Sequence, residues 1–110
     1  MLALRERERA KQEFSEALDG VAALLTPTTA HAAIPLAEVS QAVSPAVFTR
    51  MGNLLELCGL AVPNGYTRAG LPTSLLINAR GYDEAMALRI GWAYEQATSG
   101  ERRLPAGLAG

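Results

Sequence analysis

The sequence predicts an α/β fold in which a small mixed sheet of about three strands, one strand plus a β-hairpin, combines with three helices. Apolar residues recur at helical spacing near residues 3–19, 45–58 and 83–100. Short apolar runs bounded by turn residues lie near 21–26, 60–66 and 71–78. A chain of 110 residues suits one domain, so we expect residues 1–110 to form a single domain.

The first two elements follow from one apolar stripe and one apolar run. Ala10, Phe14 and Leu18 recur at spacings of four and predict a helix over residues 3–19, with Gly20 as a typical stop. Residues 21–26 are apolar without alternation and precede Pro27. Such a run is typical of a strand buried on both faces of a parallel sheet.

A long connection and a second helix come next. Residues 27–45 contain three prolines and are either a surface crossover or a functional loop. Ser44 and Pro45 favour a helix start, and Gly59 favours its end. The apolar side of this helix is expected to hold Val47, Met51, Leu54, Leu55 and Cys58.

The last elements are a hairpin and a helix. Turn residues 67–70 separate the two hairpin strands, whose Pro63 and Pro72 must lie at strand ends or irregular points. Asp83 is expected to cap the last helix and Gly100 to close it. The buried stripe of this helix is expected to hold Met86, Ile90, Ala93 and Ala97, with Trp92 off the stripe and free for a partner surface. We expect the three helices to cover one face of the sheet and to leave the other face partly apolar.

Composition excludes several classes of function. A net charge of −1 argues against capture of nucleic acid or of an anionic membrane. No apolar run approaches the roughly 20 residues of a membrane span. The single Cys58 fits a reducing, cytoplasmic location, and one Cys with one His is too few ligands for a zinc site. We therefore expect no metal, no other cofactor, no nucleic acid and no membrane partner.

Few residues offer chemistry. His31 is the only histidine and lies in the long connection, where a solvated side chain is the simpler interpretation. Cys58 is expected to pack as a small hydrophobe, although a Cys58–His31 nucleophile pair is an alternative. Asp83 and Glu84 are explained by capping at a helix start.

Five phrases, in order, resemble the C-terminal part of the amidase signature family, which are serine amidohydrolases with a Ser–cis-Ser–Lys triad. They cover nearly the whole chain: residues 19–29 (DGVAALLTPTT), 48–55 (FTRMGNLL), 60–66 (LAVPNGY), 69–77 (AGLPTSLLI) and 82–98 (YDEAMALRIGWAYEQAT).

The resemblance implies that the catalytic lysine and serines lie in portions that do not match this chain. The only lysine here is Lys11, on a charged helix face, and no Gly/Ser-rich loop is present. Family membership implies a substrate-pocket border formed by Phe48, Thr49 and Asn53. Amidotransferase-type members place a glutamine-binding carboxylate just before this segment. Residues 44–47 offer none, which favours a general amidase.

Three hypotheses follow. The first is that the chain is a C-terminal scaffold and pocket-bordering segment of an amidase, inactive alone, which self-associates or binds a partner chain that carries the catalytic portion. Alternatively, it is a non-catalytic binding or assembly subunit that self-associates or pairs through exposed sheet edges. The third hypothesis is an independent thiol enzyme, which requires a reactive Cys58 thiolate.

Overall fold

The computed structural model describes residues 1–98, 103–105 and 107–108. These residues form three α-helices and three strands, which confirms the predicted α/β class; the expected helix end at Gly100 lies outside the described residues. In chain order the elements are α1 (Leu2–Ala17), β1 (Ala23–Pro27), the 3-10 helix η1 (Leu36–Glu38), α2 (Arg50–Leu55), β2 (Cys58–Tyr66), β3 (Pro72–Ala79) and α3 (Glu84–Thr98).

The sheet has the order β1-β3-β2, and both of its strand pairs are antiparallel. The expectation of a mixed sheet with a parallel, fully buried first strand is therefore wrong. An apolar run does not encode strand direction, which is set by the partner strand. β3 is the returning strand of the hairpin and lies at the centre of the sheet, and β1 pairs antiparallel with it as an edge strand. Leu25 there lies opposite Ile77 and is 51% exposed.

The predicted hairpin is confirmed. Thr67 and Leu71 close its turn with a backbone hydrogen bond of 2.8 Å, and Gly70 takes a φ of 80°, which glycine adopts without strain. The register of β2 against β3 shifts between Pro63 and Gly65. Pro63 thus lies at an irregular point of an edge strand, as a residue without an N–H must.

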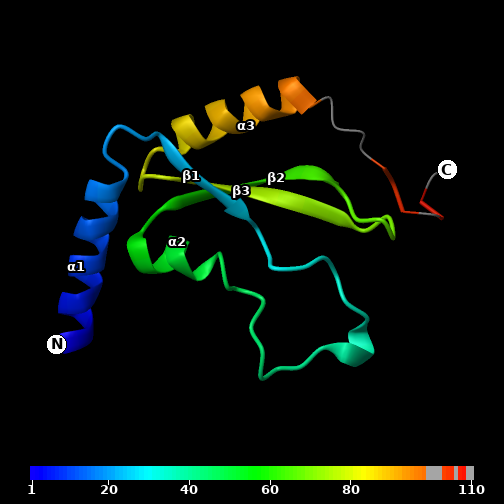
Figure 1. The fold of residues 1–110 in the computed structure, drawn as a ribbon, viewed down its shortest axis with the longest axis horizontal. Helices are drawn as coiled ribbons and strands as arrows, with labels where there is room; N and C mark the ends of the chain where they lie inside the picture. Colours follow the sequence, from blue (N-terminus) through cyan, green and yellow to red (C-terminus); the bar gives the residue numbers. More distant parts are fainter. Residues whose placement is uncertain (99–102, 106, 109–110) are drawn as a thin grey trace.

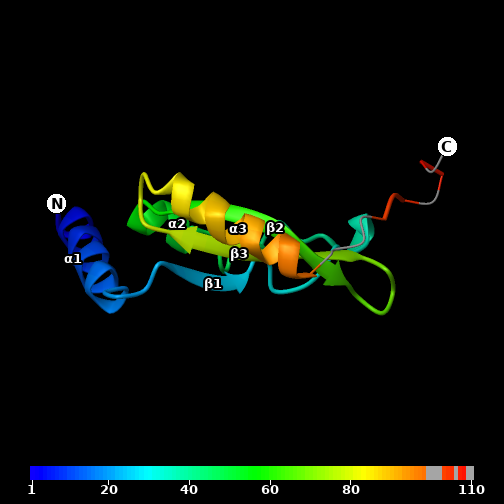
Figure 2. The ribbon, with the colours of Figure 1, turned by 90° about the horizontal axis from the view of Figure 1, so that it is seen from above.

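Helix α3 covers one face of the sheet along the hairpin, while β1 lies at its side (Figures 1 and 2). Ile77 and Ala79 on β3 are fully buried there with Val62 on β2. Gly91 brings α3 close to the strands, because a Cβ at this position would lie 2.7 Å from Leu60 Cδ2.

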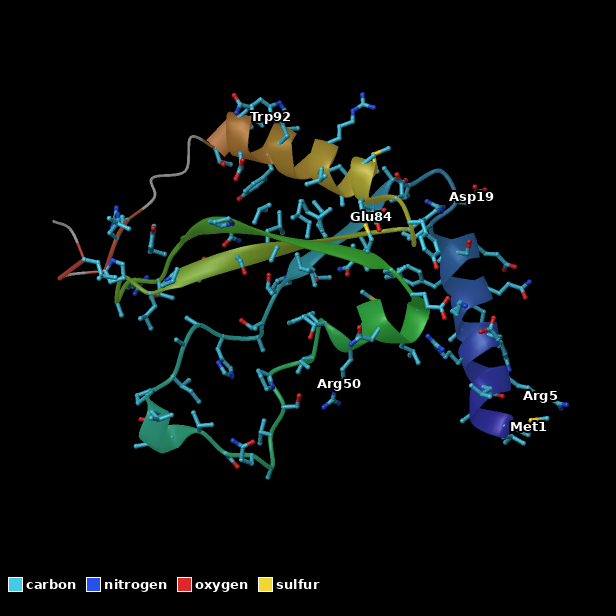
Figure 3. The ribbon with its side chains drawn as sticks, turned by 180° about the vertical axis from the view of Figure 1, so that it is seen from behind. Met1, Arg5, Asp19, Arg50, Glu84 and Trp92 are labelled. Carbon is cyan, nitrogen blue, oxygen red and sulfur yellow. The ribbon has the colours of Figure 1, made fainter. Side chains whose placement is uncertain are left out.

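The α3 stripe differs by one residue in phase from the prediction. Ala87 and Gly91 are buried and Ile90 and Tyr94 partly so, whereas Ala93 and Ala97 are exposed. The helix turns Ala87 and Gly91 toward the sheet, because these small residues allow the closest approach of α3 to the strands. As expected, Asp83 caps the helix by accepting a hydrogen bond from Met86 N at 3.3 Å, and Trp92 points away from the sheet (Figure 3).

The other two helices do not cover the same face. Helix α2 lies on the opposite side of the sheet, and α1 packs beside α2 at the end of the molecule (Figure 1). The expectation that three helices cover one face is therefore wrong. On the second face, Leu24 and Leu76 alternate along their strands with the polar residues Thr26 and Asn78, so this face is only partly apolar.

Helix α2 is shorter than predicted. It begins at Arg50 rather than near Pro45 and ends at Leu55, where Glu56 adopts a left-handed conformation with a φ of 56°. Cys58, expected on the helix, is the first residue of β2 and pairs with Ala79. Pairing along the whole hairpin outweighs continuation of a six-residue helix, because short helices are marginal by themselves.

Residues 28–49, which we call the arm, leave the end of β1, include η1 and return to α2 on the side of the sheet opposite α3 (Figure 1). The arm corresponds to the predicted long connection. Most of its side chains are exposed. Its exposed large aliphatic residues are Ile34, Leu36, Val39, Val43 and Val47.

Candidate functional site

The three residues expected to border a pocket lie together at the junction of the arm and α2. Phe48 and Thr49 are partly buried, and Thr49 is the N-cap residue of α2 without a side-chain capping hydrogen bond. The Asn53 side chain is exposed one turn further along. The local chain path thus places all three on one short segment, with two polar side chains available for contact.

Only Asn53 of these three lines an open pocket of about 330 Å³. The pocket lies where the end of α2, the start of β2 and the turn before α3 meet. Gly81 permits this meeting, because a Cβ at that position would collide with the backbone carbonyl oxygen of Glu56. Other lining residues are Glu56, Cys58, Tyr82 and Glu84. Figure 3 shows Glu84 at the start of α3.

The thiol in this pocket is a poor nucleophile. Burial is the main cause that raises the pKa of Cys58, and the negative charges of Glu84 and Asp83 raise it further, against a backbone hydrogen bond with Ala79. The thiol is therefore protonated at neutral pH, whereas attack requires the thiolate. His31 lies on the arm, with Nδ1 3.1 Å from the Ala32 carbonyl oxygen. The thiol-enzyme hypothesis has no support in this geometry.

The Glu56 carboxylate forms ion pairs with two basic side chains of α1. Arg7 Nη2 donates to Glu56 Oε1 at 2.9 Å, and Lys11 Nζ donates to Glu56 Oε2 at 2.7 Å. The hydrogen bond from Lys11 is the main cause that lowers the pKa of Glu56. Glu56 is therefore ionised and held at neutral pH, which makes it a structural carboxylate rather than a free base.

The same contacts decide the role of Lys11. Its ammonium donates to two carboxylates, Glu56 and, at 3.3 Å, Glu8; the bond to Glu56 is the main cause that raises the pKa of Lys11. An amidase signature triad needs a lysine that exchanges a proton with a serine hydroxyl. In the described part of the chain, the hydrogen-bond partners of Lys11 are carboxylates.

Arg7 and Lys11 join α1 to α2, a contact that the sequence did not predict. Arg7 Nε donates to the Leu54 carbonyl oxygen at 2.8 Å, and Nη2 lies 3.3 Å from the Asn53 carbonyl oxygen. These carbonyls have no partner within the helix because they belong to its last turn. The available signal was the spacing of four between two basic residues on one side of α1.

The buried side chain of Asn78 is another feature that the sequence did not predict. Its side chain is 1% exposed on β3, and neither its Nδ2 nor the buried Oγ1 of Thr26 has a hydrogen-bond partner among the described residues. Asn78 Oδ1 would lie 3.9 Å from a Cβ at Gly52, which places it beneath α2. The signal was a polar residue inside the apolar run of residues 75–79.

The described residues contain no group of three or more His, Cys, Asp or Glu side chains placed to hold a metal ion. Nor does any helix among them combine the length and apolar content needed to cross a membrane.

Comparison with known proteins decides the relationship. The chain is 42% identical over 98 residues to the A-subunit of glutamyl-tRNA(Gln) amidotransferase from Myxococcus xanthus, and 36% identical over 99 residues to that of Syntrophus aciditrophicus. Each match covers 86% of this chain and 20% of the relative. The chain thus spans about a fifth of the length of the curated relatives it matches.

Solved structures give the same result. The crystal structure of the amidotransferase A-subunit from Thermotoga maritima aligns with 87% of this chain and 22% of its own, at a TM-score of 0.77 and 26% identity. This chain is homologous to a segment of the amidase signature enzymes. Native peptide amidase from Stenotrophomonas maltophilia aligns with 90% of the chain at a TM-score of 0.69 and 26% identity. No protein-family model matches the chain.

The homology to amidase signature enzymes confirms the resemblance seen in the five phrases. It covers most of this chain and about a fifth of each enzyme. It does not test the pocket-border role of Phe48, Thr49 and Asn53, which stays a prediction.

Proposed function

We propose that this chain is the C-terminal scaffold and pocket-bordering segment of a carboxamide hydrolase of the amidase signature type, and that it is inactive alone. The observation that carries the proposal is that 87% and 90% of this chain align with about a fifth of two enzymes of this family. A segment of this kind stabilises and shapes an active site whose reacting groups come from the remaining four fifths of the enzyme.

The chain by itself is inactive because its only lysine, Lys11, is protonated and paired with carboxylates. Lys11 is held by Glu8 and Glu56, and its raised pKa keeps it protonated at neutral pH. A protonated lysine cannot accept the proton of a serine nucleophile, which is the step that starts amide cleavage in a lysine–serine mechanism. The working lysine must therefore come from the rest of the enzyme.

The pocket border is proposed at the start of α2. Phe48 offers a partly buried apolar surface, and the side chains of Thr49 and Asn53 offer hydrogen bonds to a carboxamide. Residues 44–47 just before them contain no carboxylate for the ammonium group of glutamine. We therefore propose a general carboxamide substrate, although the relatives at 36% and 42% identity are named amidotransferase subunits.

Ammonia release tests this proposal with two substrates, a C-terminally amidated peptide and glutamine. The purified chain alone is expected to release no ammonia from either. It is expected to restore peptide-amide hydrolysis to the Stenotrophomonas maltophilia peptide amidase from which the matching segment has been deleted. Hydrolysis by the chain alone that is lost in Lys11→Ala would contradict the proposal.

A second candidate is a non-catalytic assembly subunit that pairs through its sheet edges. The observation that favours it is β1, an edge strand whose Leu25 is half exposed. An open edge pairs readily with a strand of another chain. Light scattering coupled to size-exclusion chromatography, together with a pull-down, distinguishes the candidates: a stable homo-oligomer lost in Leu25→Lys supports edge pairing, and a monomer that captures no partner chain excludes it.

A further inference from the structure

The chain exposes far more surface than a compact protein of its size. Its accessible surface is 8512 Å², whereas a compact monomer of 11.6 kDa exposes about 5,800 Å². Its Cα radius of gyration is 16.7 Å, against about 13 Å for a compact domain of similar length. The difference in area, about 2,700 Å², is the size of one side of a large permanent interface.

The arm carries a distinctive part of this surface. Glu38 is the only Asp, Glu, Lys or Arg among its 22 residues, whereas charged residues make up eight of the 16 in α1. The arm nevertheless exposes large aliphatic side chains, with Leu36 at 89% and Val43 at 72%. Depletion of charge together with exposed apolar side chains is typical of the centre of a protein–protein interface and atypical of a solvated loop.

The chemistry of the arm also selects the class of partner. Binding to a nucleic acid or an anionic membrane requires basic side chains that contact phosphate groups. The arm contains no Lys or Arg. A matching surface must be apolar and almost uncharged, so it belongs to another folded protein body.

We propose that the arm, residues 28–49, is a docking surface that seats against the remaining body of an amidase signature enzyme. This inference rests on the proposed function and names the contact through which the segment joins that body. Two observations favour this occupant over a second copy of the chain. The Thermotoga maritima enzyme places the homologous fold within a chain of which it forms only 22%. The arm also returns directly to Phe48 and Thr49, so docking the arm brings the proposed pocket border to the catalytic portion.

Binding of the chain to the Myxococcus xanthus A-subunit lacking its matching segment tests the proposal, and the excised segment serves as positive control. The arm variants are Leu36→Asp and Val43→Asp, whose side chains are exposed in the chain alone. The matched control is Leu88→Asp on α3, which is 60% exposed on a different surface. Urea unfolding of each variant establishes that its fold is unchanged.

Each arm variant is expected to weaken binding at least about tenfold, because it buries an unpaired carboxylate at the contact. Leu88→Asp is expected to change binding less than about threefold. Equal affinity for arm variants and wild type overturns the docking surface but leaves the proposed function intact. Failure of the wild-type chain to bind, while the excised segment binds, overturns the proposed function. A dimer of the chain alone that either arm variant dissociates assigns the surface to a second copy and overturns the choice of partner.

Discussion

Replacing Ile77 by alanine tests whether the α3 face of the sheet is the core that holds this fold together. Ile77 is fully buried at the centre of the sheet, opposite Leu25 on one side and Leu60 on the other. The change removes three methyl or methylene groups, worth about 2.4 kcal/mol in transfer energy. The cavity beneath Gly91 adds to this, so we expect a loss of about 3–5 kcal/mol in the free energy of unfolding.

Urea unfolding followed by circular dichroism measures this loss. Ile77→Val is the milder companion, expected to cost about 0.5–1.5 kcal/mol, and it keeps a measurable transition if the alanine variant is unfolded in buffer. The matched control is Leu25→Ala, in the same sheet register but 51% exposed, expected to cost about 1 kcal/mol. Equal losses for Ile77→Ala and Leu25→Ala would refute the reasoning, because they would show that α3 does not shield the centre of the sheet more than its edge.

Three further predictions concern the second face and the α1 contact. Gly81→Ala should destabilise the chain by about 1–3 kcal/mol because its Cβ collides with the Glu56 carbonyl oxygen. The matched variant Gly52→Ala has room and should stabilise α2 by up to about 1 kcal/mol; urea midpoints that do not separate the two would contradict this. Asn78→Leu should leave the stability unchanged or raise it by about 1–2 kcal/mol, because it removes an unpaired buried amide N–H; a clear loss on thermal unfolding would reveal a partner for Asn78. Glu56 has a lowered pKa in the folded chain, so its contribution is present above its ordinary value of 4.5 and is lost as the pH falls through the lower folded value. The urea midpoint of the wild type should therefore fall more steeply with acid than that of Glu56→Gln, and parallel pH profiles would show that this carboxylate does not hold α1.

Much of the fold was determined by the sequence itself. Helix α1, the turn at Gly70 and the cap at Asp83 are local features, fixed by residues close together in the chain, and the structure confirms each of them. The homology to amidase signature enzymes was likewise readable from short phrases in a fixed order. Local conformational preferences and the order of phrases along a chain need no knowledge of distant contacts.

The tertiary structure alone decided which elements meet. The direction of β1 depends on its pairing with β3, some fifty residues away. The short length of α2 depends on the pairing of Cys58 with Ala79, and the phase of α3 depends on Gly91 meeting Leu60. For the candidate site, the sequence named Asn53 and Cys58 but not the pocket that joins them to Glu84. It also named Lys11 without showing that Glu56 holds it. Strand pairing, close packing and ion pairs all join residues remote in sequence, so periodicity and local composition carry no record of them.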